Sequence, residues 1–183
     1  RSISDSVVAG DIELAAVDRA TVVPANNNTT LQAADIINLD TNVGSGNLGN
    51  TGQVDLLSTN IDIISGSLAD MLTINTSADP AGDGNGRTID LKDKVHSNII
   101  TDTGIISAAD LNTIEAGLGA EGASTVNVDA ATGFTGLLAA IKTLEDSVTA
   151  SNIVRPGGSK DKVVVEDTGT VSADDLIEAN KLA

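Results

Sequence analysis

Short apolar runs alternate with capped helix starts along this chain. Residues 102–116 (DTGIISAADLNTIEA) place the apolar pair Ile105-Ile106 before a Ser-x-x-Asp box at 107–110, and a second copy (DTGTVSADDLIEA, with its box at 172–175) begins at Asp167. In such a box the serine hydroxyl accepts hydrogen bonds from the first free backbone N–H groups of a helix. Each copy therefore predicts a short strand that leads into a capped helix.

The helix-start pattern recurs at a regular spacing. The helix starts can be aligned on the position that Asp110 holds, and we call the residue at this position the seed of each helix. The seeds are Asp35, Asp70, Asp110, Ala140 and Asp175, which are 35, 40, 30 and 35 residues apart. A unit of one strand and one helix is too small to bury its own apolar face, so successive units are expected to stack and share a core. The sequence thus predicts an α/β repeat fold, an irregular strand-helix solenoid with a period of about 35 residues. The alternative is a β-rich sandwich or a β-solenoid with short helices, because the Thr, Val, Asn and Gly content also suits stacked strands.

Periodicity places the individual elements. Helices are expected over residues 31–39, from Ser67 onward, and over residues 108–116, 136–147 and 172–182. Strands are expected within residues 54–64, 88–95, 125–128 and 162–165. Residues 1–23 form an N-terminal strand segment that is expected to dock on a neighbouring subunit, and residues 24–183 form the strand-helix repeat domain.

The composition indicates thin aliphatic layers. Hydrophobic residues make up 40% of the chain, but Phe134 is its only aromatic residue and Met71 its only sulphur-containing one. Val, Ile, Leu and Ala must therefore do nearly all of the packing. The chain begins with Arg1 instead of Met, which favours a processed form or a fragment of a longer polypeptide.

The charge excludes one class of partner. The chain has 26 acidic against 10 basic residues and a formal net charge of −16, which repels phosphate backbones, so nucleic-acid binding is not expected. The surplus of carboxylates fits an extracellular polymer that binds Ca²⁺ or Mg²⁺, and it also fits the solubility of a repetitive protein. No apolar run approaches the roughly 20 residues of a membrane span, so none is expected.

No catalytic site is expected. The chain has no cysteine, His96 is its single histidine, and no Gly-x-Ser-x-Gly elbow is present. An acid pair such as Asp129 and Glu166 could in principle act in glycosidase chemistry, but nothing in the sequence places the two residues together.

Two segments resemble calcium-binding loops. The first lacks the carboxylate ligands that such a loop requires. In the segment around Gly104, the positions that supply the first ligands of an EF-hand loop hold Ile99, Thr101 and Thr103, which lack carboxylates. An intact EF-type site is therefore not expected there.

The better calcium candidate is the glycine-rich loop 79–87 with its following strand. Its ligands would be Asp79, Asp83, Asn85 and Asp90, because the interspersed glycines let the backbone curl and point carbonyl oxygens inward. A plain flexible turn explains the same composition. Ca²⁺ is the single cofactor that the sequence suggests.

The string DTGxISAADLNTIEA followed by TVNVDA resembles the degenerate TGTISAADLNTI-type repeats of very large cyanobacterial and other bacterial surface and secreted structural proteins. The resemblance covers residues 100–130 and 163–179 most closely. It implies a structural role at the cell surface or outside the cell, and it carries over no catalytic residues.

These observations predict a structural subunit, or a repeat fragment, of an extracellular filament, sheath or surface layer that associates with copies of itself. Stacked units have open strand edges at which identical units can join. The alternative is an adhesin-type binding module, stabilised by calcium, that contacts a glycan or a surface through the loops 41–53 and 79–87.

Overall fold

The chain adopts an α/β fold with parallel sheets. In a computed structural model of the protein, the described residues are 2–3, 19–22, 29–42, 53–55, 61–79, 89–90, 97–119, 125–155 and 162–182. Of the segment 1–23, these ranges include only β1 (Ser2–Ile3) and β2 (Arg19–Val22). The docking role predicted for this segment therefore falls mostly outside the described residues.

Five α-helices lie within the described residues. They are α1 (Ala33–Asn42), α2 (Leu68–Ser77), α3 (Ala108–Ile114), α4 (Leu138–Thr149) and α5 (Ala173–Ala179). A π-helical turn (Glu115–Gly119) follows α3, and a 3₁₀ turn (Asn180–Leu182) follows α5. Each of these helices begins two residues before one of the five seeds, so a helix is present around every seed.

Serine side chains cap three of these helices, as the Ser-x-x-Asp boxes predict. The Oγ atoms of Ser67, Ser107 and Ser172 each accept from the backbone N–H three residues later, at 3.1, 3.2 and 3.1 Å. These bonds satisfy N–H groups that have no partner inside the helix. The predicted caps of α2, α3 and α5 are therefore confirmed.

Two predicted helix starts are wrong by two residues, for the same reason. Leu31 and Gln32 end strand β3 (Thr29–Gln32), so α1 begins at Ala33. Likewise, Gly133–Gly136 forms strand β11, so α4 begins at Leu138. In both places strand pairing includes residues that helical periodicity alone would assign to the helix.

The strands form three sheets in which every described pairing is parallel. The orders are β1-β2-β4-β7-β6, β12-β10-β8-β5-β3 and β13-β11-β9. The remaining strands are β4 (Gln53–Asp55), β5 (Ile61–Gly66), β6 (Ala78–Asp79), β7 (Ile89–Asp90), β8 (Ser97–Ile100), β9 (Ile105–Ser107), β10 (Thr125–Asn127), β12 (Ile153–Val154) and β13 (Lys162–Val165).

The sequence offset between paired strands is not constant. Gly66 of β5 pairs with Ile100 of β8, whereas Gly136 of β11 pairs with Val165 of β13, which is nearer to it in the sequence. The β8–β10 and β9–β11 pairs share an offset that is shorter still. Successive units therefore differ in length, and a single fixed period does not describe the pairing.

The core consists of aliphatic rows that run across the strands. One row crosses the five strands from β3 to β12 through residues in register, each at most 5% exposed: Leu31, Ile64, Asn98, Val126 and Ile153. The helices cover these strands with the fully buried side chains of Met71, Leu111 and Ile141, which occupy the same position in α2, α3 and α4. The predicted aliphatic core is thus confirmed.

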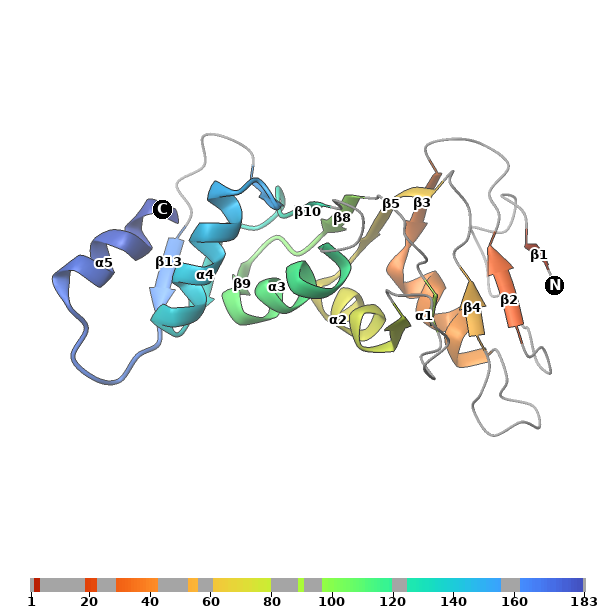
Figure 1. Cartoon of the computed structure of the whole chain (residues 1–183), viewed down its shortest axis with the longest axis horizontal. Coiled ribbons are helices and arrows are strands. Elements are labelled where there is room, and N and C mark those ends of the chain that lie inside the picture. The colour runs from red at the N-terminus through yellow and green to blue at the C-terminus, as the bar shows by residue number, and fades with distance from the viewer. Residues whose placement is uncertain are drawn as a thin grey trace.

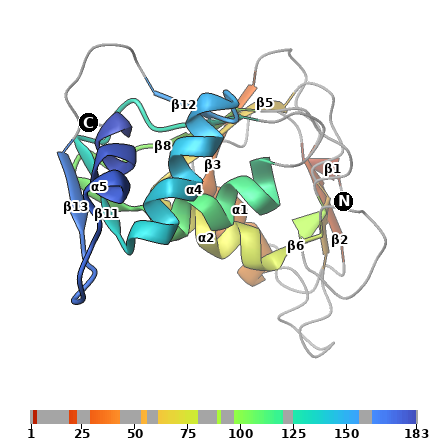
Figure 2. The same ribbon diagram turned by 60° about the vertical axis from the view of Figure 1, so that its left-hand side comes forward.

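The helices follow one another in chain order along the long axis, and the two termini lie at opposite ends (Figure 1, Figure 2). The principal helix contacts join α1 to α2, α2 to α3, α3 to α4 and α4 to α5. Among the residues that the structure describes, no helix has the length and apolar character that a bilayer crossing requires.

Candidate functional site

The predicted calcium residues are only partly within the described chain. Asp83 and Asn85 lie outside the described residues, as does His96. Asp79 of β6 and Asp90 of β7 occupy registered positions in neighbouring parallel strands, and β4 places Asp55 in register with Asp90 on its other side. Where the structure describes side chains, it brings no three acidic or histidine side chains together as a metal site. Calcium binding at the loop 79–87 stays a prediction.

The acid pair Asp129 and Glu166 has local structural partners. The Asp129 backbone N–H donates to Asn127 Oδ1 at 2.9 Å, in the turn after β10. Glu166 Oε1 accepts from Thr135 Oγ1 at 2.8 Å, across the β11–β13 pair. Each residue thus sits after the end of a strand and contributes to a turn or to a strand pairing.

The feature that recurs along the described chain is the junction between successive strand-helix units. Helices α1, α3 and α5 begin with alanine, and we call them the alanine-start helices; α2 and α4 begin with leucine, and we call them the leucine-start helices. The two kinds alternate along the chain. Each kind of junction has its own set of contacts, so the junctions are described in turn.

Where an alanine-start unit follows a leucine-start unit, an aspartate from the later unit caps the earlier helix. Asp102 Oδ2 accepts the backbone N–H of Leu68 at 2.6 Å, and Asp167 Oδ2 accepts that of Leu138 at 2.6 Å. Beside each cap the backbones also join, through Thr101 N–H to Gly66 O at 2.9 Å and Glu166 N–H to Gly136 O at 3.0 Å. The same two bonds therefore occur at both junctions.

The aspartate cap matters most for α4. The residue before this helix is Leu137, which has no hydrogen-bonding side chain and is 58% exposed. An acidic group at a helix N-terminus satisfies a free N–H and interacts favourably with the helix dipole. Asp167 thus supplies to α4, from 29 residues away, the cap that Ser107 and Ser172 supply to their own helices.

Where a leucine-start unit follows an alanine-start unit, a glycine faces the first alanine of the earlier helix. A Cβ atom added to Gly66 would lie less than 3.0 Å from Ala33 Cβ, and one added to Gly136 would lie 3.6 Å from Ala108 Cβ. Gly136 also has φ +156°, a conformation that residues with side chains rarely adopt. Glycine thus allows the close approach of the two units at Gly66, whereas at Gly136 it is the backbone conformation that favours glycine.

The alternation explains why the two DTG copies are so far apart in the sequence. They precede α3 and α5, which are both alanine-start helices, and a leucine-start unit lies between them. The spacing of the copies therefore spans a pair of units, and the aspartate of each copy serves the helix of the unit before it.

Polar side chains also link neighbouring helices. Asn112 Nδ2 of α3 donates to Ala140 O of α4 at 2.8 Å, and Lys142 Nζ of α4 lies 3.1 Å from Asp175 Oδ1 of α5. The Ser172 hydroxyl donates to Asp175 Oδ2 at 2.6 Å. This hydrogen bond, and then the lysine, hold the pKa of Asp175 below its ordinary value. The last described helix is thereby tied to its neighbour.

A cavity of about 170 Å³ lies beside β12, lined by Val148, Ser151, Ile153, Val154 and Arg155. These lining residues include one cationic side chain and no acidic one. The Arg155 guanidinium lies 5.8 Å from the centre of the Phe134 ring and donates to Leu182 O, so this arginine fastens the C-terminal turn to the core. The contacts at the cavity are structural.

Comparison with protein-family models, with curated proteins and with solved structures finds no significant match to this chain.

The capping role of Asp102 and Asp167 was not predicted from the sequence, which indicates only a strand-to-helix joint within one unit. Two signals for it were present. An aspartate recurs at the same place in both copies, and the helix start at 137–138 (Leu-Leu) contains no capping residue of its own.

Proposed function

We propose that this chain is a structural subunit, or a repeat fragment, of an extracellular filament, sheath or surface layer, and that it associates with copies of itself. The proposed architecture is an irregular strand-helix solenoid in which units of about 35 residues stack along one axis. The resemblance to repeats of large bacterial surface and secreted proteins supports the extracellular placement.

The proposal rests on the exposure of apolar side chains in the last described unit. Leu176 occupies the position in α5 that Met71, Leu111 and Ile141 occupy in α2, α3 and α4. Those three side chains are fully buried, whereas Leu176 is 47% exposed. Its neighbour Ile177 is 66% exposed. Apolar side chains on such a face favour association with a further unit.

The edge strands support the same proposal. In the described sheets β12 and β13 are the edge strands nearest α5, and Val154 of β12 is 39% exposed. A parallel edge strand carries N–H and C=O groups that can pair with another strand. Both sheets can therefore be continued by a neighbour.

Sedimentation velocity over a range of protein concentrations tests the proposal. We expect the full chain to form species that grow with concentration, and Leu176→Asp to shift this growth to higher concentration. A chain that sediments as a monomer at every concentration would contradict the proposed function.

The second candidate is a binding module stabilised by calcium, and one observation favours it. Asp55, Asp90 and Asp79 are in register across β4, β7 and β6, and like charges at neighbouring positions of a sheet repel one another unless a cation intervenes. Calorimetric titration with CaCl₂ distinguishes the two candidates. The binding module would be favoured if the parent chain released heat on binding Ca²⁺, if Asp90→Asn released none, and if the parent chain stayed monomeric.

A further inference from the structure

Two asparagines at one junction each bury a side-chain oxygen that has no partner. We call β8, β9 and α3 the α3 unit, and β10, β11 and α4 the α4 unit, which stacks on it. Asn98 lies in β8 and Asn112 in α3. The Oδ1 atoms of both are buried without a hydrogen-bond partner among the described residues. Such atoms are uncommon in folded proteins and call for an explanation.

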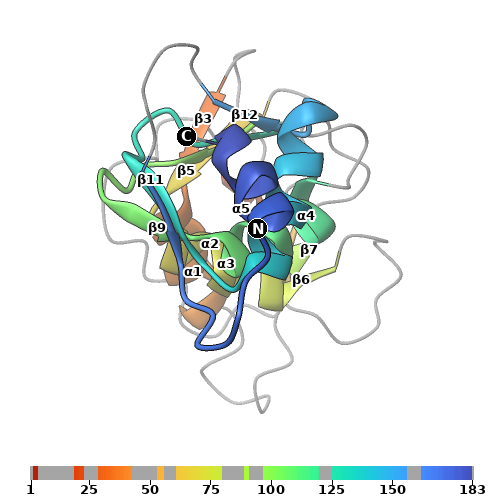
Figure 3. The ribbon, with the colours of Figure 1, turned by 90° about the vertical axis from the view of Figure 1, so that its left-hand side faces the viewer.

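The amide nitrogens of both asparagines bind main-chain carbonyl groups of the α4 unit. Asn98 Nδ2 donates to Thr125 O at 3.3 Å, and Asn112 Nδ2 donates to Ala140 O at 2.8 Å. The first bond joins the strands β8 and β10, and the second joins the helices α3 and α4. Seen along the long axis, these helices lie to one side of β9 and β11 (Figure 3). The two amides thus link the units on both their strand side and their helix side.

Stability does not account for these amides. A buried amide that leaves its oxygen without a hydrogen bond adds little net stability, because the oxygen has lost its contact with water. Aliphatic residues occupy the matching positions of the α2 unit, which consists of β5 and α2. Ile64 lies next to Asn98 in its buried row, and Leu72 is the fifth residue of α2, as Asn112 is of α3. An α3 unit with aliphatic residues at both positions would therefore be at least as stable.

The α1 unit, formed by β3 and α1, shows what such an α3 unit would resemble. Both α1 and α3 begin with alanine, and each is followed by a leucine-start helix. At the positions of Asn98 and Asn112, the α1 unit has Leu31 and Ile37, and the α2 unit stacks on it. An aliphatic α3 unit would therefore also accept the α2 unit of a second copy. Wrong pairing of similar units is a characteristic failure of repeat proteins.

On the strand side, the α4 unit has a smaller residue than the α2 unit. Val126 of β10 lies in register with Asn98, whereas the α2 unit has Ile64 in this row. The shorter side chain leaves room for the Asn98 amide to reach Thr125 O. The larger isoleucine would crowd the amide.

On the helix side, the fifth residue of one helix meets the third residue of the next. Asn112 of α3 reaches the main chain of Ala140, whose small side chain leaves the carbonyl group accessible. The third residue of α2 is Asp70 instead. Its carboxylate would face the buried Oδ1 atom of Asn112, and two acceptor oxygens repel each other. The α2 unit therefore fits the α3 unit less well than the α4 unit does.

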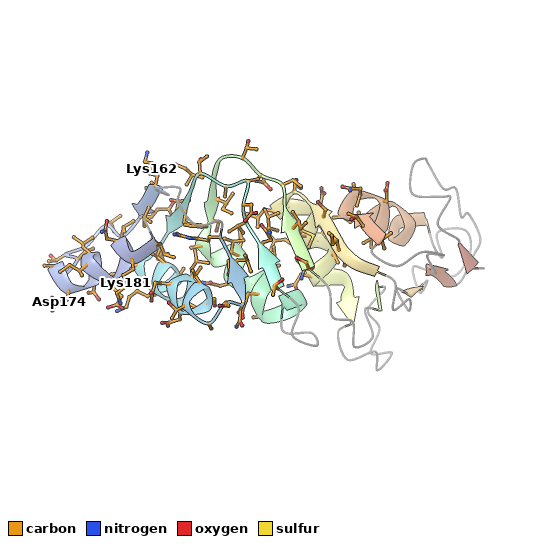
Figure 4. All side chains as sticks on the ribbon, turned by 90° about the horizontal axis from the view of Figure 1, so that it is seen from above. Lys162, Asp174 and Lys181 are labelled. Atoms are coloured by element: carbon orange, nitrogen blue, oxygen red, sulfur yellow. The ribbon has the colours of Figure 1, made fainter. Side chains whose placement is uncertain are left out.

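The next junction uses charges at the same positions. Lys142, the fifth residue of α4, lies 3.1 Å from Asp175, the third residue of α5. The charged side chains of Lys162, Asp174 and Lys181 also lie toward the end formed by β13 and α5 (Figure 4). The two junctions are thus distinguished by amides at one and by charges at the other.

We infer that Asn98 and Asn112 are specificity residues, which admit the α4 unit onto the α3 unit and reject the α2 unit of a second copy. A buried polar group can fix which partners pair even where it adds no stability. This selection operates while the chain folds, so it does not depend on the proposed self-association.

Refolding two single-cysteine chains together tests the inference, because the chain has no cysteine of its own. One copy carries Thr73→Cys in α2 and the other carries Thr113→Cys in α3, both at exposed positions. The copies are unfolded in urea, mixed, refolded and diluted below the onset of self-association, and a short bis-maleimide then links neighbouring thiols. We expect the parent pair to give no more linked dimer than copies that are refolded separately and then mixed. In the background Asn98→Val with Asn112→Leu, we expect linked dimer above that level.

The matched control background is Ile74→Val with Ile114→Val, which trims the buried faces of α2 and α3 but keeps both amides. Its linked dimer should stay at the level of the parent pair. Urea denaturation of the chain with Asn98→Val and Asn112→Leu should show a stability equal to or above that of the parent chain.

Three results would overturn the inference. The first is a chain with Asn98→Val and Asn112→Leu that gives no more linked dimer than the parent. The second is an equal rise in the control, because loosened packing would then be the cause. The third is a loss of stability or a failure to fold, because the amides would then hold the junction together. None of these results affects the proposed function, which sedimentation of the parent chain tests.

Discussion

Asp167 caps a helix that lies 29 residues before it: its Oδ2 atom accepts the backbone N–H of Leu138 at 2.6 Å. The bond joins the last described unit to the one before it, at a helix whose own preceding residue is Leu137. Asp102 makes the same bond to Leu68. Cohesion between units thus rests on capping in addition to apolar packing.

Asp167→Ala should lower the free energy of unfolding by about 1 kcal/mol, because the N-terminus of α4 then has no side-chain cap. Asp102→Ala should cost less, since Ser67 also caps α2. Urea denaturation of the two variants beside the parent chain measures the difference. Equal losses would mean that the aspartates act by something other than capping.

Leu137→Ser should restore stability in the Asp167→Ala background, because serine gives α4 a cap of its own. In the parent chain the same substitution should change stability little, since Asp167 already binds the first N–H and Leu137 is mostly exposed. A double-mutant cycle by urea denaturation yields the coupling between the two positions. Additive effects would rule out a shared role in capping α4.

The sequence predicts those features of the fold that arise between residues close together in the chain, and it misses those that arise between residues far apart in the chain. The Ser-x-x-Asp boxes are local, and the presence of the five helices follows from them and from apolar spacing. The starts of α1 and α4 were predicted two residues early, because the preceding residues pair in strands β3 and β11. Strand β11 was not predicted, because Gly133 and Gly136 are typical of turns. Their reason is a neighbour: a Cβ on Gly133 would collide with the backbone of Lys162, with which it pairs.

The capping aspartates escaped prediction for the same reason. Asp102 and Asp167 act on helices 34 and 29 residues earlier, and periodicity within a helix does not report which residue lies beyond its end. The offsets between paired strands likewise differ from the spacing of the helix starts, which does not report the register of the strands.

Gly66→Ala should destabilise the chain by about 1–3 kcal/mol, because its new methyl group would overlap Ala33 Cβ. Ala33→Gly in the same chain should recover part of the loss by removing that methyl group. Thermal melting of the two single variants and the double variant measures the recovery. If the double variant loses the sum of the single losses, the two residues do not meet as described.

Asn98→Val should be neutral or stabilise the chain by about 1 kcal/mol. Asn98 is fully buried in an otherwise aliphatic row, and its Oδ1 atom has no hydrogen-bond partner among the described residues. The bond from its Nδ2 atom to Thr125 O is long, at 3.3 Å. Asn98→Asp is the matched control and should destabilise strongly, because it buries a charge. A large loss on Asn98→Val, measured by urea denaturation, would show that the amide has a role of its own.

Stability should fall in acid partly through Asp175. Its pKa is lowered in the folded chain by the Ser172 hydroxyl and by Lys142, so its contribution is present above the ordinary aspartate pKa of about 3.9. The contribution is lost as pH falls through the lower folded value. Asp175→Asn should therefore reduce the difference in melting temperature between about pH 5 and pH 2. An unchanged pH dependence would exclude Asp175 from the acid response.

The proposed function requires that copies of this chain stack end to end into an extracellular assembly. Electron microscopy of the purified full chain above its association threshold, with and without calcium, tests this claim most directly. We expect linear polymers in the parent chain, and their loss in Leu176→Asp. Isolated particles of monomer size at every concentration, in both conditions, would contradict the claim.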